Sequence, residues 1–93
     1  MDTDLNSKLD NIANKEGVKG VLITDEMGLC LGVRGIAKTE NAAFITSIAN
    51  ASRSLQEQHE LESKNEYPTI TVDFENMKIA IKPHGSFTLA IFL

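Results

Sequence analysis

Hydrophobic residues recur at helical spacing at the start of the chain. Leu5, Leu9 and Ile12 are separated by four and three positions, a spacing that places them along one side of a helix. Gly17 suits the end of this helix, and the narrow apolar stripe indicates that only one side is buried. A membrane-surface helix is the weaker interpretation, because such helices carry Lys and Arg on their polar face.

Two strands joined by a tight turn are predicted next. Residues 18–25 include three consecutive apolar residues, 21–23, and a short run of this kind is typical of a strand buried on both faces. From 29 to 33 the side chains alternate between two sides, which predicts a second strand paired with the first as a hairpin. Asp25 and Gly28 are the first and fourth residues of the connecting segment, as type I turns favour.

Three glycines in this hairpin raise the question of a phosphate-binding loop. Gly28, Gly32 and Gly35 form the pattern G-x-x-x-G-x-x-G, whereas a dinucleotide-binding loop needs G-x-G-x-x-G between a strand and a helix. The Gly-Lys-Ser/Thr of a Walker loop is also missing. We therefore interpret the glycines as part of the hairpin and not as a nucleotide site.

Residues 40 to about 62 are predicted to form the main helix. Thr39 is the expected N-cap, and Glu40 lies in the first turn, where an acidic side chain is favourable. Apolar and small side chains cover about half of the circumference, more than the ~100° arc that one packing surface needs. We therefore expect this helix to contact both its own sheet and something else. The arc consists of two adjoining stripes: Phe44, Ile48, Ala51 and Leu55, and beside them Ala42, Ile45, Ala49 and Ser52.

Three further strands are predicted after a loop at 62–67. The first covers 68–74 and the second 77–82, and both alternate between apolar and polar residues. Residues 82–85 have Pro second and Gly fourth, which predicts a type I turn. The last strand, 86–93, carries apolar residues on both faces.

These elements predict an α+β domain with the order α-β-β-α-β-β-β. The two strands that are apolar on both faces, 18–25 and 86–93, should be central and adjacent, which gives a five-stranded antiparallel sheet of order 2-1-5-4-3. Strand 68–74 is then an edge strand, and Pro68 hinders pairing only at its beginning. An edge strand with unpaired backbone groups tends to accept a strand of another chain. The sequence ends at Leu93 without a third helix, so we expect another protein to cover part of the sheet.

Length and composition narrow the class of protein. Ninety-three residues predict one domain, 1–93, with a small core that a partner subunit would supplement. The single cysteine fits a reducing compartment. The net charge is −4 and Lys and Arg are scattered, which argues against nucleic-acid binding. No apolar segment approaches the roughly 20 residues of a spanning helix, so we expect a soluble, cytosolic protein that inserts in no membrane itself.

An enzyme is the competing class. The candidate residues for nucleophilic or acid–base chemistry are Cys30, His59, His84, Asp25 and Ser86. Nucleophilic catalysis needs a base beside the nucleophile and a third group that orients the base, and no spacing here indicates that arrangement. The two histidines also lack the spacing of a zinc site. We therefore expect no catalytic residues, no metal and no cofactor.

Three segments resemble a known family. Residues 20–25 read G-V-L-x-T-D, residues 28–35 read G-L-x-L-G-x-R-G, and residues 79–85 read I-x-x-K-x-x-G. Together with the order of elements, these resemble the roadblock/LC7 family, with its longin-like and profilin-like fold, and within it the fifth subunit of the Ragulator (LAMTOR) complex. The resemblance covers nearly the whole chain, although residues 40–67 match only in pattern.

The resemblance implies a scaffold and not an enzyme. Such a subunit pairs with another roadblock-family subunit, and a lipidated Ragulator subunit holds the assembly on the late endosomal or lysosomal surface. There the complex anchors Rag GTPases and supports amino-acid activation of TORC1. Two alternatives share the fold: a homodimeric roadblock-type regulator of a small GTPase, and a dynein-associated light chain.

The resemblance also implies a partner interface on the main helix and the edge strand. We assign the stripe of small side chains to the partner, because a second helix can approach it closely, and the bulkier Phe44, Ile48 and Leu55 to the sheet. The alternative, in which both stripes lie under the chain's own fold, stays open. Arg34 is either a solvated strand end or an assembly contact. The expected interface residues are Ala42, Ile45, Ala49, Ser52, Thr69, Thr71 and Asp73.

Overall fold

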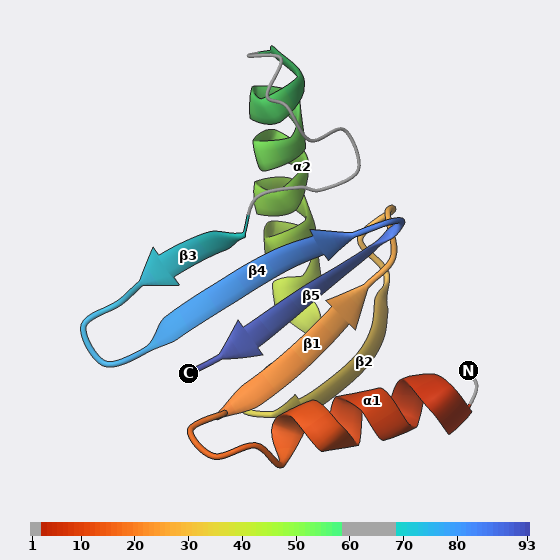
Figure 1. Ribbon diagram of the computed structural model, residues 1–93, viewed down its shortest axis with the longest axis vertical. Helices are drawn as coiled ribbons and strands as arrows, with labels where there is room; N and C mark the ends of the chain where they lie inside the picture. Colours follow the sequence, from red (N-terminus) through yellow and green to blue (C-terminus); the bar gives the residue numbers. More distant parts are fainter. Residues whose placement is uncertain (1–2, 59–68) are drawn as a thin grey trace.

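One antiparallel sheet carries a helix on each of its faces (Figure 1). The computed structural model describes residues 3–58 and 69–93. In chain order the elements are α1 (Thr3–Ala13), β1 (Gly20–Thr24), β2 (Cys30–Gly35), a short 3-10 helix η1 (Thr39–Asn41), α2 (Ala42–Gln58), β3 (Ile70–Asp73), β4 (Lys78–His84) and β5 (Phe87–Phe92).

The predicted strand order is confirmed: the sheet runs β2-β1-β5-β4-β3, and all four neighbouring pairs are antiparallel. Leu22 at the centre of β1 lies opposite Val33 on one side and Ala90 on the other. All five residues of β1 are buried, which explains why its apolar run does not alternate.

Two apolar clusters divide the core between the faces of the sheet. The larger cluster joins α2 to Leu22, Ile81 and Phe92. The smaller cluster places Leu9 of α1 against Val21 and its neighbours on β1. Because successive strand residues point to opposite faces, Val21 and Leu22 each serve a different helix.

The turn between β1 and β2 is closed by Asp25. Its Oδ1 accepts hydrogen bonds from the backbone N–H groups of Met27 and Leu29, both at 2.9 Å. The N–H of Gly28 donates to the Asp25 carbonyl, and Gly28 has a φ of 89°, a conformation that favours glycine. The expected tight turn is thus confirmed, with the Asp side chain supplying its hydrogen bonds.

The close approach of α1 to β2 depends on Gly32. A Cβ built on Gly32 would overlap Cδ1 of Leu9, and Leu9 is itself fully buried. The glycine therefore serves helix packing, in agreement with its interpretation as a structural residue.

Two of the predicted boundaries are wrong for identifiable reasons. The main helix is preceded by η1, and the N–H of Lys38 donates to Asn41 Oδ1 at 2.9 Å, so Thr39 lies inside the 3-10 turn and is not a helix N-cap. Residues 82–85 do not form a turn. Strand β4 continues through Pro83 to His84, and the hairpin closes at Gly85 and Ser86, with His84 opposite Phe87.

Pro83 is tolerated in this strand because β3 does not reach it. The pairing of β3 with β4 stops at Ile81, so the missing N–H of Pro83 interrupts no bond to β3. Strand β3 itself has four residues, fewer than the predicted 68–74. The expected helix end at 59–62, the loop at 62–67 and Pro68 lie outside the described residues.

Candidate partner-binding surface

Exposed hydrophobic side chains gather where α2 faces the edge of the sheet. Phe44 on α2 is 72% exposed, and Phe74, which follows β3, is 54% exposed. Ile48, Val72 and Met77 lie between them and are half-buried. We call these five residues the α2–β3 surface.

A groove of about 470 Å³ runs through this surface, between α2 and strands β3 and β4. Besides the α2–β3 surface its walls include Ile36 and Ile79, and its polar members are Lys38 and Asn41. Contiguous exposed apolar patches of this kind mark surfaces where another molecule binds.

The edge of the sheet adds unpaired backbone beside these side chains. Strand β3 is the last strand on its side of the sheet, so within residues 3–58 and 69–93 no strand pairs with its outer edge. An exposed edge supplies N–H and C=O groups that a strand of another chain can pair with. The α2–β3 surface therefore combines an apolar patch with a strand edge that no other described strand covers.

The assignment of the two α2 stripes is reversed. The stripe predicted to face a partner is buried in the chain's own core at Ala42, Ile45 and Ala49. In the stripe predicted to face the sheet, Phe44 and Leu55 are exposed to solvent, and Ile48 packs partly inward. The physical reason is that small side chains let α2 lie close to its own sheet, which leaves the larger ones outside.

The other predicted interface residues lie on β3 or directly before it, except Ser52, which lies on α2. Thr69, Thr71 and Asp73 are exposed, and Asp73 is 3.7 Å from Lys78 on β4. Ser52 is half-buried, and its hydroxyl donates to the Ala49 carbonyl at 2.8 Å. Participation of these residues in an interface stays a prediction.

Arg34 makes its contacts within the chain. Its Nε donates to Asp10 Oδ1 of α1 at 2.8 Å, and Nη1 donates to the Val33 carbonyl at 2.9 Å. A weaker contact joins Nη2 to Asn6 at 3.4 Å. These bonds attach α1 to the edge strand β2 and favour a structural role over an assembly contact.

The structure does not bring the described catalytic candidates together. Cys30 on β2 and His84 on β4 are separated by β1 and β5, on the order of 14 Å at the usual strand spacing. Cys30 packs with the α2 cluster, whereas His84 lies on the α1 face beside Leu89.

Asp25 and Ser86, the other candidates among the described residues, also lack a catalytic arrangement. Asp25 is engaged by backbone N–H groups of its own turn, and Ser86 lies in the exposed hairpin loop. His59 lies outside the described residues. Among the residues that the structure describes, no cluster of His, Cys, Asp and Glu has the composition of a metal site. None of the described helices has the length and apolar character needed to cross a bilayer.

Ile36, Phe74 and Met77 are surface residues that the sequence reasoning did not single out. Phe74 continues the apolar alternation of β3 beyond Asp73, so its pattern resembles that of an ordinary core residue. The available signal was the wide apolar arc of α2, which exceeds what one sheet can cover.

The family model described as "LAMTOR5: Ragulator complex protein LAMTOR5" matches residues 1–93. A Ragulator complex protein LAMTOR5 homolog of Nematostella vectensis is 31% identical over 91 residues, which cover 98% of this chain and 94% of the relative. The corresponding homolog of Dictyostelium discoideum is 28% identical over 91 residues, with 98% and 96% covered.

Solved structures support the fold. Myxococcus xanthus MglB superposes with a TM-score of 0.82 at 20% identity and covers 98% of this chain and 76% of its own. A roadblock/LC7 domain from Streptomyces avermitilis gives 0.73 at 14% identity, with 92% and 72% covered. Because the family model spans the whole chain and the fold is that of roadblock domains, this protein belongs to the LAMTOR5 family of Ragulator complex proteins.

Proposed function

We propose that the chain is a non-catalytic scaffold subunit that pairs with a second roadblock-family subunit through the α2–β3 surface. Together with a lipidated Ragulator subunit, this pair would anchor Rag GTPases at the late endosomal or lysosomal surface and support amino-acid activation of TORC1. Membership of the LAMTOR5 family supports the complex, and the surface supports the pairing.

The single observation that carries the proposal is the exposure of Phe44 beside β3, whose outer edge pairs with no other strand of the described residues. Large aromatic side chains that become buried at the centre of an interface contribute a disproportionate share of the binding energy. A partner helix lying against Phe44 and Ile48 would cover the apolar groove. A partner strand beside β3 would pair the free edge and extend the sheet.

The geometry favours a subunit of the same fold as the partner. A roadblock domain offers both a helix and a neighbouring edge strand, so that a twofold-like arrangement matches helix to helix and strand to strand. Stable interfaces of this kind bury on the order of 2,000 Å², and the combination of a helix face with a strand edge is suited to such an area.

Affinity purification of the tagged full-length chain at native expression level, followed by mass spectrometry, tests the proposal. We expect a second roadblock protein, a lipidated subunit and Rag GTPases to be recovered in stable ratios. Recovery of self-associated chain with a lone small GTPase would instead support the regulator alternative. Recovery of dynein subunits would support the light-chain alternative, and recovery of the chain alone would exclude all three.

A further inference from the structure

The sheet has a second edge, whose backbone differs from that of the first. Strand β2 is the last strand on the side opposite β3, and no strand from the described parts of the chain pairs with its outer edge. Like β3, it leaves backbone N–H and C=O groups that a strand of another chain could pair with. Figure 1 shows the two strands at opposite sides of the sheet.

The backbone of β2 is irregular where it pairs with β1. Ile23 lies opposite Gly32, but the next residue, Thr24, lies opposite Cys30, so Leu31 is one residue more than the pairing needs. Such a β-bulge leaves a residue unpaired, disrupts the ladder of hydrogen bonds and bends the strand. By contrast, all four residues of β3 pair with β4 in a regular register.

The packing on both sides of Leu31 shows the effect of the bulge. Cys30 packs with the α2 cluster, whereas Leu31 packs with the α1 cluster and Gly32 lies against Leu9 of α1. Leu31 and Gly32 are consecutive and yet are both turned to the α1 face, where a regular strand would alternate. Because the hydrogen-bonding groups of a regular edge also recur in a fixed order, a regular strand could not match β2 on both sides of the bulge.

The regular part of β2 is bounded at its other end as well. It ends at Gly35, which has a φ of 66°, a left-handed conformation that interrupts the extended backbone. Between the bulge and this residue lies Arg34, and a charged side chain on an edge strand disfavours pairing with another sheet. The edge of β2 therefore offers only Gly32, Val33 and Arg34 between two irregular positions.

A sheet with two regular edges could grow without limit. The β2 edge of one copy would pair with the β3 edge of the next, and a contact of this head-to-tail kind leads to open filaments when the rotation does not close a ring. A bulge at one edge opposes this growth and leaves the other edge available.

We propose that the bulge at Leu31 keeps β2 from accepting a strand, so that this chain forms one end of any sheet that it shares with a partner. The chain then pairs through β3 with a single subunit, and the shared sheet stops at β2. The role of the bulge is independent of the proposed scaffold function, whereas the limit of one strand-pairing partner rests on it.

Deletion of Leu31 tests the proposal, because it should restore a regular edge. Cys30 and Gly32, which already lie on opposite faces, would become consecutive and keep Thr24 and Ile23 as their partners. Leu31→Ala is the matched control, because it removes the same apolar contact with the α1 cluster but keeps the extra residue. A cooperative thermal transition establishes that each chain is folded.

Sedimentation velocity over a range of protein concentrations gives the molar mass of each purified full-length chain. We expect deletion of Leu31 to raise the weight-average mass at least about twofold above that of the Leu31→Ala chain, since head-to-tail growth joins two or more copies. The Leu31→Ala chain should keep the mass of the unmodified chain. Slower hydrogen exchange at the amides of Val33 and Arg34 should identify β2 as the new contact.

A folded chain without Leu31 that has the mass of the Leu31→Ala chain would overturn the proposal. Equal association of the Leu31→Ala chain would overturn it too, because the lost side chain and not the bulge would then be the cause. Both results concern the chain alone. Recovery of a roadblock partner by the unmodified chain tests the scaffold function separately.

A measurement on the unmodified chain decides the question if deletion of Leu31 prevents folding. A synthetic peptide of alternating Thr and Val is added to the isotope-labelled chain, and backbone amide chemical shifts are followed. We expect the shifts of residues 30–35 to stay unchanged at the peptide concentration that moves those of residues 70–73. Changes at residues 30–35 would show that β2 accepts a strand, which contradicts the proposal.

Discussion

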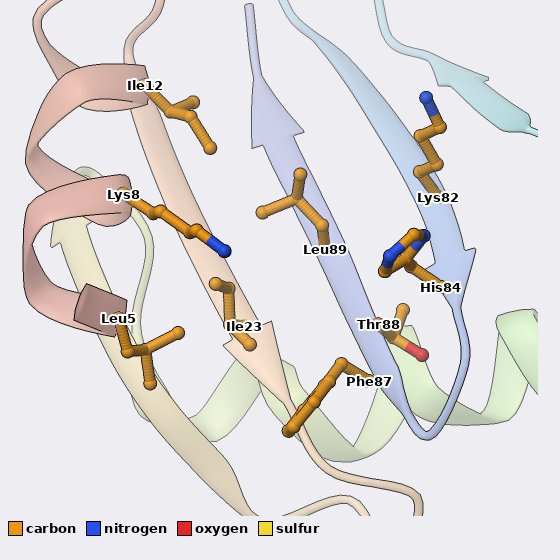
Figure 2. A pocket seen from close by; sticks show the side chains of 9 residues that line it. All are labelled: Leu5, Lys8, Ile12, Ile23, Lys82, His84, Phe87, Thr88 and Leu89. Carbon is orange, nitrogen blue, oxygen red and sulfur yellow. The ribbon is translucent and has the colours of Figure 1, made fainter. Parts of the chain in front are cut away.

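The Arg34 guanidinium on β2 lies 2.8 Å from the Asp10 carboxylate on α1. This ion pair is the polar counterpart of the contact between Leu9 and Gly32, which joins the same two elements. Together the two contacts hold α1 against the outer half of the sheet, and α1 in turn forms one wall of a groove between α1 and β4, whose floor contains Ile23 and Leu89 (Figure 2).

Arg34→Ala and Asp10→Ala should each lower the free energy of unfolding slightly. Both side chains are partly exposed, at 32% and 58%, so water and salt screen the attraction, and a coupling of about 0.2–1 kcal/mol is expected. A double-mutant cycle by urea denaturation measures this coupling. A contrary result would be an Arg34→Glu chain that no longer co-purifies with its partner proteins although its free energy of unfolding is unchanged. That result would contradict the structural role and favour an assembly contact.

Gly32→Ala should destabilise the chain by about 1–3 kcal/mol, because the added methyl group overlaps the buried Leu9 side chain and overpacking carries a cost of this size. Chemical denaturation gives the value. Combining Gly32→Ala with Leu9→Ala should relieve the overlap, so the double variant should be more stable than the sum of the two single effects predicts. Strict additivity would show that the overlap is not the cause.

Thr24 and Thr46 share a buried hydrogen bond between β1 and α2, with their hydroxyl oxygens 3.0 Å apart. Thr24→Val leaves the Thr46 hydroxyl without this partner in the core, which should cost about 1–3 kcal/mol. Replacing both residues with Val removes both polar groups, and the double variant should recover part of that loss. Thermal unfolding of the three variants distinguishes this outcome from two independent losses.

Ala49→Glu should unfold the chain and not simply separate it from a partner. Ala49 is 0% exposed and lies between α2 and the sheet, so the variant would bury a carboxylate without a partner, at a cost of several kcal/mol. Circular dichroism and amide-exchange measurements test this. A folded Ala49→Glu chain with a native-like spectrum would contradict the placement of this stripe in the core.

The strand order could be predicted from the sequence because a strand that is buried on both faces has a recognisable pattern of its own. β1 and β5 carry apolar residues at consecutive positions, and only central strands need them. The hairpin connections then left few arrangements for the remaining strands. The same reasoning placed β3 at the edge, which the structure confirms.

The orientation of α2 could not be predicted in the same way. Its apolar arc has two stripes, and the period of the pattern does not say which stripe faces the sheet. Ala42 and Ala49 are small enough to suit a partner helix or the chain's own strands equally well. The choice depends on the distance between α2 and the sheet, which is a property of the whole fold.

Hydrophobic residues predict burial in general but do not say which chain provides it. Phe44 has the size and character of a core residue, and its sequence position gives no sign that it is 72% exposed. In the proposed assembly it is a core residue of the interface, so its burial would depend on a second molecule.

Recovery of the roadblock partner by a Phe44→Glu chain tests the central claim most directly. Ala43→Glu is the matched control, since Ala43 is the adjacent exposed residue of α2, lies about 100° around the helix and is not part of the groove. Both variants should keep the melting temperature of the unmodified chain, because neither side chain is buried in the domain.

The measurement is the ratio of roadblock partner to tagged chain after affinity purification, determined by quantitative mass spectrometry. We predict that Phe44→Glu lowers this ratio at least about tenfold, as expected for a central aromatic residue of an interface, and that Ala43→Glu leaves it unchanged. A folded Phe44→Glu chain that recovers its partner in the normal ratio would contradict the assignment of the α2–β3 surface.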